Sequence, residues 1–205
     1  MTARFTETAP IDARRALDPY VRWPVNARWA AAALIASAAV AARAAGMSFA
    51  VSGILLIAAG VLFYNAWLRR WSQRHAGRLG TADGRERFAL WQVSLDSAAL
   101  SAAVYLSGGL GSPALVALIV PACCAALLLP APQAWGVGTC LLGALALMGL
   151  AELAGWLPHQ PLILRGEDLA PAPGAWGAAA TLGGVTAIGL PIALLAGASL
   201  HRLHR

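Results

Sequence analysis

The amino-acid sequence predicts an all-helical membrane protein with six transmembrane segments and both termini in the cytoplasm. The chain has 205 residues, of which 59% are hydrophobic and only 12% are charged, whereas soluble domains carry about 25% charged residues. The apolar residues form runs long enough to cross a hydrocarbon core of ~30 Å, which takes roughly 20 helical residues. These runs do not alternate as the strands of a membrane barrel would. The distribution of arginines then sets the orientation.

Six apolar runs are predicted to span the membrane as helices. They cover residues 28–45, 48–68, 88–106, 113–129, 134–153 and 175–200. The first run is interrupted by Arg43, which we place at its outer end, where a long side chain reaches the headgroups. These runs make up a transmembrane domain over residues 28–200.

The segments outside the predicted spans are short. Residues 1–27 contain Pro10 and Pro24 and are expected to form a flexible cytoplasmic segment without a cleavable signal peptide. Residues 155–174 carry four prolines and are expected to form an ordered or extended strap on the outer side. Residues 201–205 are the predicted cytoplasmic tail.

The orientation follows from the arginines, which supply all 15 basic residues because the chain has no lysine. Five lie before the first run or at its first residue, six lie between the second and third runs, and two follow the sixth. Arg43 and Arg165 fall on the opposite side. Because cytoplasmic loops carry the excess of basic residues, we expect both termini in the cytoplasm of a bacterium and a multi-pass location in its inner membrane.

Several other classes of function are excluded by the residues. The net charge of +6 could suggest nucleic-acid binding, but the arginines lie beside membrane spans and form no recognition motif. Cys123, Cys124 and Cys140 lie within predicted spans and are expected to be small packing residues; the alternative, a redox switch, needs an electropositive and accessible site. No spacing of histidine, cysteine or carboxylate residues indicates a metal site. We therefore expect the chain to lie in the lipid bilayer and to bind neither nucleic acid nor a metal.

Three polar residues lie inside the predicted second and third spans. Asp96 lies about two turns into the third span, and Tyr64 and Asn65 lie about one turn from the cytoplasmic end of the second. Because consecutive spans are antiparallel, these side chains are predicted to lie within reach of one another. Ionisable groups in a membrane interior are costly and mark functional sites. The cluster is either an interhelical polar clamp or a protonatable or ligand-contacting group.

The turn between the third and fourth runs, residues 107–113 (SGGLGSP), is the Gly-rich turn. Gly108 and Gly109 allow positive φ angles, and Ser112 followed by Pro113 is a typical start for a helix. A hairpin turn accounts for these residue types. A ligand contact is the alternative.

The wider pattern resembles a known family. It includes Tyr64-Asn65 before an arginine-rich loop, Asp96, Tyr105-Leu106-Ser107-Gly108-Gly109, Ser112-Pro113, Pro121 and Leu127-Leu128-Leu129-Pro130. Together these residues resemble the six-helix N-terminal sensor region of bacterial histidine kinases of the redox-responsive RegB/PrrB type. The resemblance runs from about residue 28 to the end of the chain and is strongest between residues 64 and 130.

The resemblance implies a quinone contact at the Gly-rich turn, because a G-G-x-x-N-P-F segment is implicated in quinone sensing in that family. Carried over, it marks Gly108, Gly109, Ser112 and Pro113, with Tyr105 beside them, and ubiquinone as the sensed ligand. Ser112 stands where the family has asparagine, and Ala114 stands where it has phenylalanine. The pattern therefore indicates a sensor module more strongly than it indicates that the ligand is a quinone.

The chain itself is not expected to be an enzyme, because no phosphoacceptor box and no Gly-rich ATP lid occur in its 205 residues. The sequence predicts a signal-input module of the two-component type that acts on a histidine kinase core, either in the same polypeptide or in a partner protein. A second copy of the chain, in a homodimer, is the other expected partner. One alternative is a small structural or assembly protein of the membrane. The other is a transporter or membrane enzyme, for which inverted repeats and a catalytic cluster are lacking.

Overall fold

The computed structural model describes residues 9–75, 79, 81–170, 174, 177 and 183, with side chains from residue 23 onward. These residues are mostly helical. The α-helices are α1 (Ala9–Ala44), α2 (Val51–Arg74), α4 (Ala82–Leu106), α5 (Ile119–Leu128) and α6 (Ala131–Leu153). Two 3-10 helices, η1 (Gly109–Gly111) and η2 (Pro113–Leu118), and three short strands, β1 (Met47–Ser48), β2 (Ile163–Leu164) and β3 (Glu167–Asp168), complete the fold.

Three of the described helices are long and apolar enough to cross a membrane. They are the segment Trp23–Ala44 of α1, the whole of α2 and the whole of α6. They correspond to the predicted first, second and fifth spans, and they indicate a helical membrane protein. The predicted sixth span and the predicted tail lie outside the described residues, apart from the isolated positions 177 and 183.

The predicted third span forms a helix, but α4 is not among the helices that meet this criterion. It begins at Ala82, where the Thr81 side chain accepts a hydrogen bond from the Gly84 amide as an N-cap. Its apolar stretch is interrupted by polar residues, and one of them, Gln92, is fully buried. Gln92 and Asp96 are accommodated because they face the other helices and are hydrogen-bonded there.

The predicted fourth span is not one continuous α-helix. Ser112 and Pro113 start it as predicted, since the Ser112 hydroxyl accepts from the Ala114 amide at 3.1 Å. The chain then forms 3-10 helix over η2, and α5 has only ten residues. Part of the reason is Pro121, which has no N–H to donate to the Ala117 carbonyl as an α-helix requires. The two pieces together form a shorter apolar helix, Pro113–Leu128.

The expectation that residues 1–27 are a flexible segment is wrong from Ala9 onward, because α1 begins there. Pro10 does not prevent this, since a proline in the first helical turn lacks an N–H that would have no helical partner anyway. The many alanines and arginines that follow favour helix. The helix passes through Pro24 without ending.

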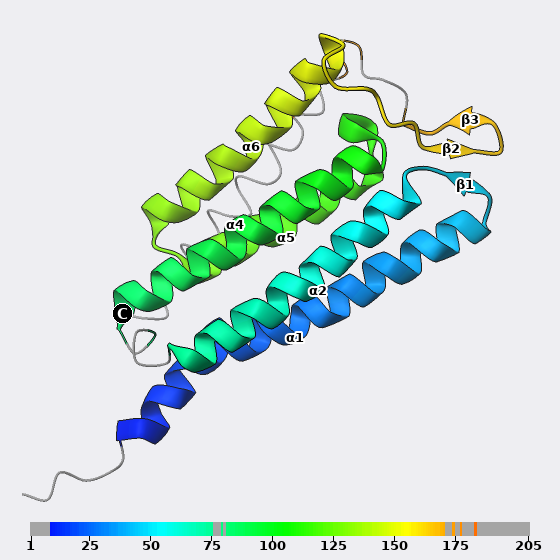
Figure 1. The fold of residues 1–205 in the computed structure, drawn as a ribbon. Helices are drawn as coiled ribbons and strands as arrows, with labels where there is room; N and C mark the ends of the chain where they lie inside the picture. The colour runs from blue at the N-terminus through cyan, green and yellow to red at the C-terminus, as the bar shows by residue number, and fades with distance from the viewer. Residues whose placement is uncertain are drawn as a thin grey trace, which may run out of the picture.

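The helices form a layered bundle (Figure 1). α1 and α2 lie side by side as an antiparallel pair, α4 and α5 lie next to them, and α6 lies on the far side of α4 and α5. The N-terminal end of α1 projects beyond the other helices. The turn between α1 and α2, the Gly-rich turn and the loop after α6 all lie at the opposite end of the bundle.

A small antiparallel sheet closes that end. β1, in the turn between α1 and α2, pairs with β2, which pairs with β3. Arg165 and Gly166 connect β2 to β3 with φ angles of 52° and 89°, as a two-residue hairpin turn requires. The predicted strap is therefore ordered in part as a hairpin that ties the loop after α6 to the α1–α2 turn.

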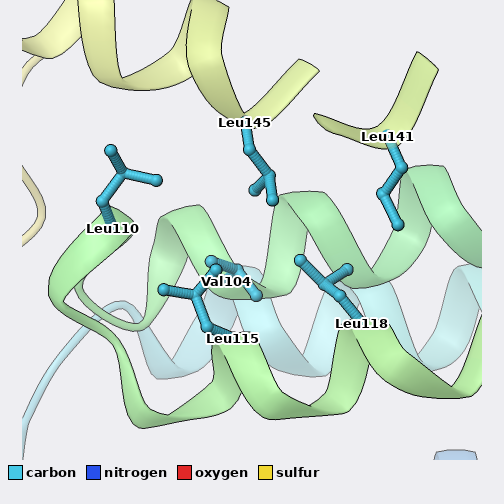
Figure 2. Close-up of a cluster of buried hydrophobic side chains, with 6 residues drawn as sticks. All are labelled: Val104, Leu110, Leu115, Leu118, Leu141 and Leu145. Carbon is cyan, nitrogen blue, oxygen red and sulfur yellow. The ribbon is translucent and has the colours of Figure 1, made fainter. Parts of the chain in front are cut away.

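A buried apolar cluster joins the Gly-rich turn to the helices. Leu141 and Leu145 of α6 point toward Val104 of α4 and toward Leu115 and Leu118 of η2. Leu110 of the Gly-rich turn lies beside them and is 2% exposed (Figure 2). In a membrane such a cluster stabilises by van der Waals packing rather than by removal of apolar surface from water, and these contacts hold the turn against α4 and α6.

Candidate functional site

An ion pair with a tyrosine attached lies inside the bundle. The Arg28 Nε donates to Asp96 Oδ1 at 2.8 Å, and its Nη2 donates to Asp96 Oδ2 at 2.7 Å. The Tyr64 hydroxyl donates to Asp96 Oδ1 at 2.6 Å. The three residues come from α1, α2 and α4, so the Asp96 carboxylate connects three helices. We call Arg28, Tyr64 and Asp96 the polar triad.

Gln92 completes the surroundings of the arginine. The Arg28 Nη1 donates to Gln92 Oε1 at 2.7 Å. Arg28 is 7% exposed and Gln92 is 0% exposed. A buried charge is tolerated when it is paired and hydrogen-bonded, and the two-point contact with Asp96 is the strong geometry for a guanidinium and a carboxylate.

The predicted cluster of Tyr64, Asn65 and Asp96 is brought together in part. The contact of Tyr64 with Asp96 is confirmed. Asn65 is fully buried, but its Nδ2 donates to the Val25 carbonyl at 3.0 Å, and its Oδ1 has no hydrogen-bond partner among the described residues. Asn65 therefore joins α2 to α1 and is not part of the polar triad.

Sequence reasoning did not find Arg28 or Gln92. Arg28 was counted with the cytoplasmic arginines, although it lies inside the apolar segment Trp23–Ala44. Gln92 lies four residues before Asp96, and residues at that spacing share one face of a helix. That spacing was a usable signal for Gln92. For Arg28, a cation is the expected partner of a carboxylate inside a membrane, but the sequence does not say which arginine approaches it.

The polar triad lies at the wall of a cavity of about 140 Å³ between α1, α2, α4 and α5. Apart from the triad, the lining is almost wholly apolar. It includes Ile35, Ile57, Val61, Val93, Leu100 and Val120. The site thus combines a neutralised ion pair with a hydrocarbon-like space.

The Gly-rich turn has the backbone that its glycines predict. Gly108 and Gly109 have φ angles of 120° and 58°, which side chains other than that of glycine rarely adopt. The hydroxyls of Ser107 and Ser112 lie 2.8 Å apart and share a hydrogen bond. Both serines also bond to backbone, Ser107 to the Ala103 carbonyl and Ser112 to the Ala114 amide. Pro113 follows as an exposed residue.

Neighbouring residues fill the space beside the turn. A Cβ added to Gly108 would lie 2.5 Å from the Cβ of Ala170, and one added to Gly109 would collide with the Glu152 carboxylate. Gly108, Gly109 and Ser112 are buried. The quinone contact at this turn therefore stays a prediction, and a ligand beside Gly108 or Gly109 would have to displace Ala170 or Glu152.

Tyr105, the remaining predicted ligand contact, points to the loop after α6. Its hydroxyl donates to the Pro158 carbonyl at 2.7 Å and lies 3.5 Å from the Gln160 Nε2. It is not among the residues that line the cavity. Tyr105 therefore fastens the loop to α4 in the structure.

Replacing Tyr105 with phenylalanine is expected to loosen this loop while leaving the bundle folded. The variant loses the bond to the Pro158 carbonyl and the long bond from Gln160, which together cost about 0.5–1 kcal/mol because the site is partly exposed. Hydrogen exchange should become faster across residues 157–170 and stay unchanged in α2. Trp156→Phe, at an 86% exposed position of the same loop, is the control and should have no effect. Equal exchange in Tyr105→Phe and wild type would contradict this role.

Comparisons of the chain with protein-family models, with curated protein sequences and with solved structures found no match. Function is therefore inferred from the polar triad, the cavity and the Gly-rich turn.

Proposed function

We propose that the chain is a membrane signal-input module of the two-component sensor type. In this proposal six helices span the inner membrane of a bacterium with both termini in the cytoplasm. The module responds to the redox state of a quinone and passes the signal to a histidine kinase core, in the same polypeptide or in a partner. The resemblance to the RegB/PrrB-type sensor region motivates the family and the ligand.

The observation that carries the proposal is the polar triad. An arginine, an aspartate and a tyrosine from three helices meet within an apolar bundle, and ionisable groups at such depth are functional by default. A signal needs two arrangements of the helices with different affinity for the ligand. A single carboxylate that joins three helices is suited to this, because breaking or re-forming its bonds changes how all three pack.

A second function is supported by the same contacts. The polar triad has short hydrogen bonds and a two-point ion pair, which suit a permanent clamp. In that case the chain is a small structural or assembly protein of the membrane. The two functions differ in whether the helices respond to a ligand.

A fluorine NMR experiment separates them. The full chain is labelled with 5-fluorotryptophan, reconstituted in nanodiscs that contain decylubiquinone, and compared in the oxidised and reduced states. Its eight tryptophans are assigned by single Trp→Phe changes. A sensor should show redox-dependent shifts at Trp23, which lines the cavity, and also at Trp135 in the first turns of α6, outside the cavity lining.

The redox response at Trp135 should disappear in Asp96→Asn, which removes the ion pair and keeps the side-chain shape. Asp83→Asn, in the first turn of α4, is the control and should retain it. Identical spectra of the wild type in both redox states would contradict the sensor function and favour the clamp.

A further inference from the structure

The cavity beside the polar triad is unfilled space in an otherwise packed region, whereas neighbouring residues fill the space beside the Gly-rich turn. Three groups of the triad, Arg28, Asp96 and Tyr64, line the cavity together with apolar side chains from four helices. Close-packed interiors contain few voids of this size. The cavity surface is almost wholly apolar, and the polar atoms of the triad reach it over a small area. An apolar pocket with a few polar groups has the general form of a ligand site.

We propose that this cavity, and not the Gly-rich turn, is the ligand site of the module, and that its ligand is a neutral molecule with a single ring bearing a carbonyl or hydroxyl oxygen. The inference rests on the proposed sensor function, because it names the place and the chemical class of what is sensed. The size, the charge and the opening of the cavity support it separately.

The cavity has room for about one ring of a ligand. Its volume is about 140 Å³, close to the ~150 Å³ of an engineered apolar cavity that stays dry and binds benzene. A single six-membered ring thus fits without displacing side chains.

The charges on the wall favour a neutral ligand. Arg28 and Asp96 cancel each other in their ion pair, so a ligand with a net charge would enter an apolar space without a counter-ion, which is costly. In addition, a guanidinium has five N–H groups. Each Arg28 terminal nitrogen makes one bond within the described residues, to Gln92 or to Asp96, and has a second N–H that can be directed to Tyr64 or to a ligand.

The same wall offers an acceptor as well as donors. The Tyr64 hydroxyl gives its hydrogen to Asp96. Its oxygen lies beside the Arg28 guanidinium and has two lone pairs, so it can accept from Arg28 and also from a ligand. A ring with a carbonyl oxygen can accept from Arg28, and a ring with a hydroxyl can also donate to Tyr64. A pure hydrocarbon ring would make neither bond. This is why the proposal specifies an oxygen on the ring.

The cavity opens toward the outer surface of the described bundle between α1 and α5. Two of its lining residues, Trp23 on α1 and Val120 on α5, are 58% and 60% exposed. Exposed apolar residues on membrane-spanning helices face lipid, so the opening admits a molecule dissolved in the bilayer. A lipid-soluble neutral ring has this route, whereas an ionic compound does not.

A matched pair of probes tests the proposal. 4′-Fluoroacetophenone and 1-ethyl-4-fluorobenzene have similar size, and only the first has a carbonyl. Their ¹⁹F resonances are titrated against the full chain in nanodiscs, with empty nanodiscs as the control for partition into lipid. We expect saturable binding of the ketone with a Kd at least about tenfold lower than that of the hydrocarbon, the factor that about 1.4 kcal/mol gives.

Two alanines of α4 supply matched variants. Ala99 lines the cavity, and Ala98 is an exposed neighbour outside the lining. Ala99→Leu should fill the space and weaken ketone binding at least tenfold, and Ala98→Leu should leave it unchanged. Both variants should elute as wild type does in gel filtration. If Ala99→Leu disturbs the fold, Val93→Leu, which adds one methylene group at the same wall, replaces it.

The outcomes are distinct. Equal ketone binding by Ala99→Leu and wild type, or no saturable binding, would overturn the cavity as the site. Equal affinity for ketone and hydrocarbon would overturn the need for the oxygen. Saturable ketone binding without any redox response at Trp135 would support the site and contradict the sensor function. A redox response at Trp135 that survives Ala99→Leu would support the sensor function and overturn the cavity site.

Discussion

Replacing Arg28 with methionine is expected to lower the free energy of unfolding by about 3–5 kcal/mol, because it leaves the partly buried carboxylate of Asp96 inside the apolar bundle without its cation. Reversible unfolding in mixed micelles with increasing SDS, followed by circular dichroism, measures the change. Arg70→Met, at an exposed position of α2, removes the same charge where it is solvated and should change the free energy by no more than about 0.5 kcal/mol.

The double variant Arg28→Met/Asp96→Leu distinguishes a stranded charge from a loss of packing. Replacing both partners of a buried ion pair by apolar residues of similar volume is often neutral or stabilising. The double variant should therefore recover most of the stability that Arg28→Met loses. A double variant as unstable as the sum of the two single variants would show that the ion pair is not coupled as its geometry requires.

Replacing Gly108 with alanine is expected to have the second-largest effect on stability. Its φ of +120° disfavours any side chain, and the new Cβ would lie 2.5 Å from the Cβ of Ala170, which is 0% exposed. We expect a loss of about 2–4 kcal/mol, as the sum of about 1 kcal/mol for the backbone and about 1–3 kcal/mol for overpacking. The same SDS titration measures it.

Three further variants test the cause. Gly109→Ala should cost less than Gly108→Ala, because the group it meets is the end of the flexible Glu152 side chain. Ala170→Gly, added to Gly108→Ala, should restore the packing part of the loss but not the backbone part. Gly60→Ala, in open space on α2, should stabilise the protein by about 0.5–1 kcal/mol. A neutral Gly108→Ala would show that the turn is not packed as described.

The long apolar helices were predictable because their cause is local. A run of apolar residues satisfies its backbone in lipid by forming a helix, whatever its neighbours are, so α2 and α6 follow from their own residues. The predicted helix boundaries were less accurate where a proline or a contact with another helix affects the backbone. The 3-10 helix of η2 departs from the predicted continuous span, in part because of Pro121, and α1 extends well ahead of the predicted start at Arg28.

The candidate site was predictable only in part for the same reason. The contact of Tyr64 with Asp96 followed from the antiparallel order of two consecutive spans. The pairing of Arg28 with Asp96 joins residues 68 positions apart, and the arginine pattern assigned Arg28 to the membrane surface. The filling of the Gly-rich turn by Ala170 and Glu152 likewise depends on a loop that lies far along the chain.

By itself the sequence determined that the described chain is built from apolar helices, where most of their apolar segments lie, and that Gly108, Ser112 and Pro113 form a tight turn. These features depend on residues close together in the chain, through hydropathy, capping and the permitted φ angles. The tertiary structure alone decided which arginine neutralises Asp96, where Asn65 makes its bond, and that an open cavity lies at the polar triad rather than at the turn. Those features depend on how the helices are rotated and packed against one another, and that rotation is set by the sum of many side-chain contacts.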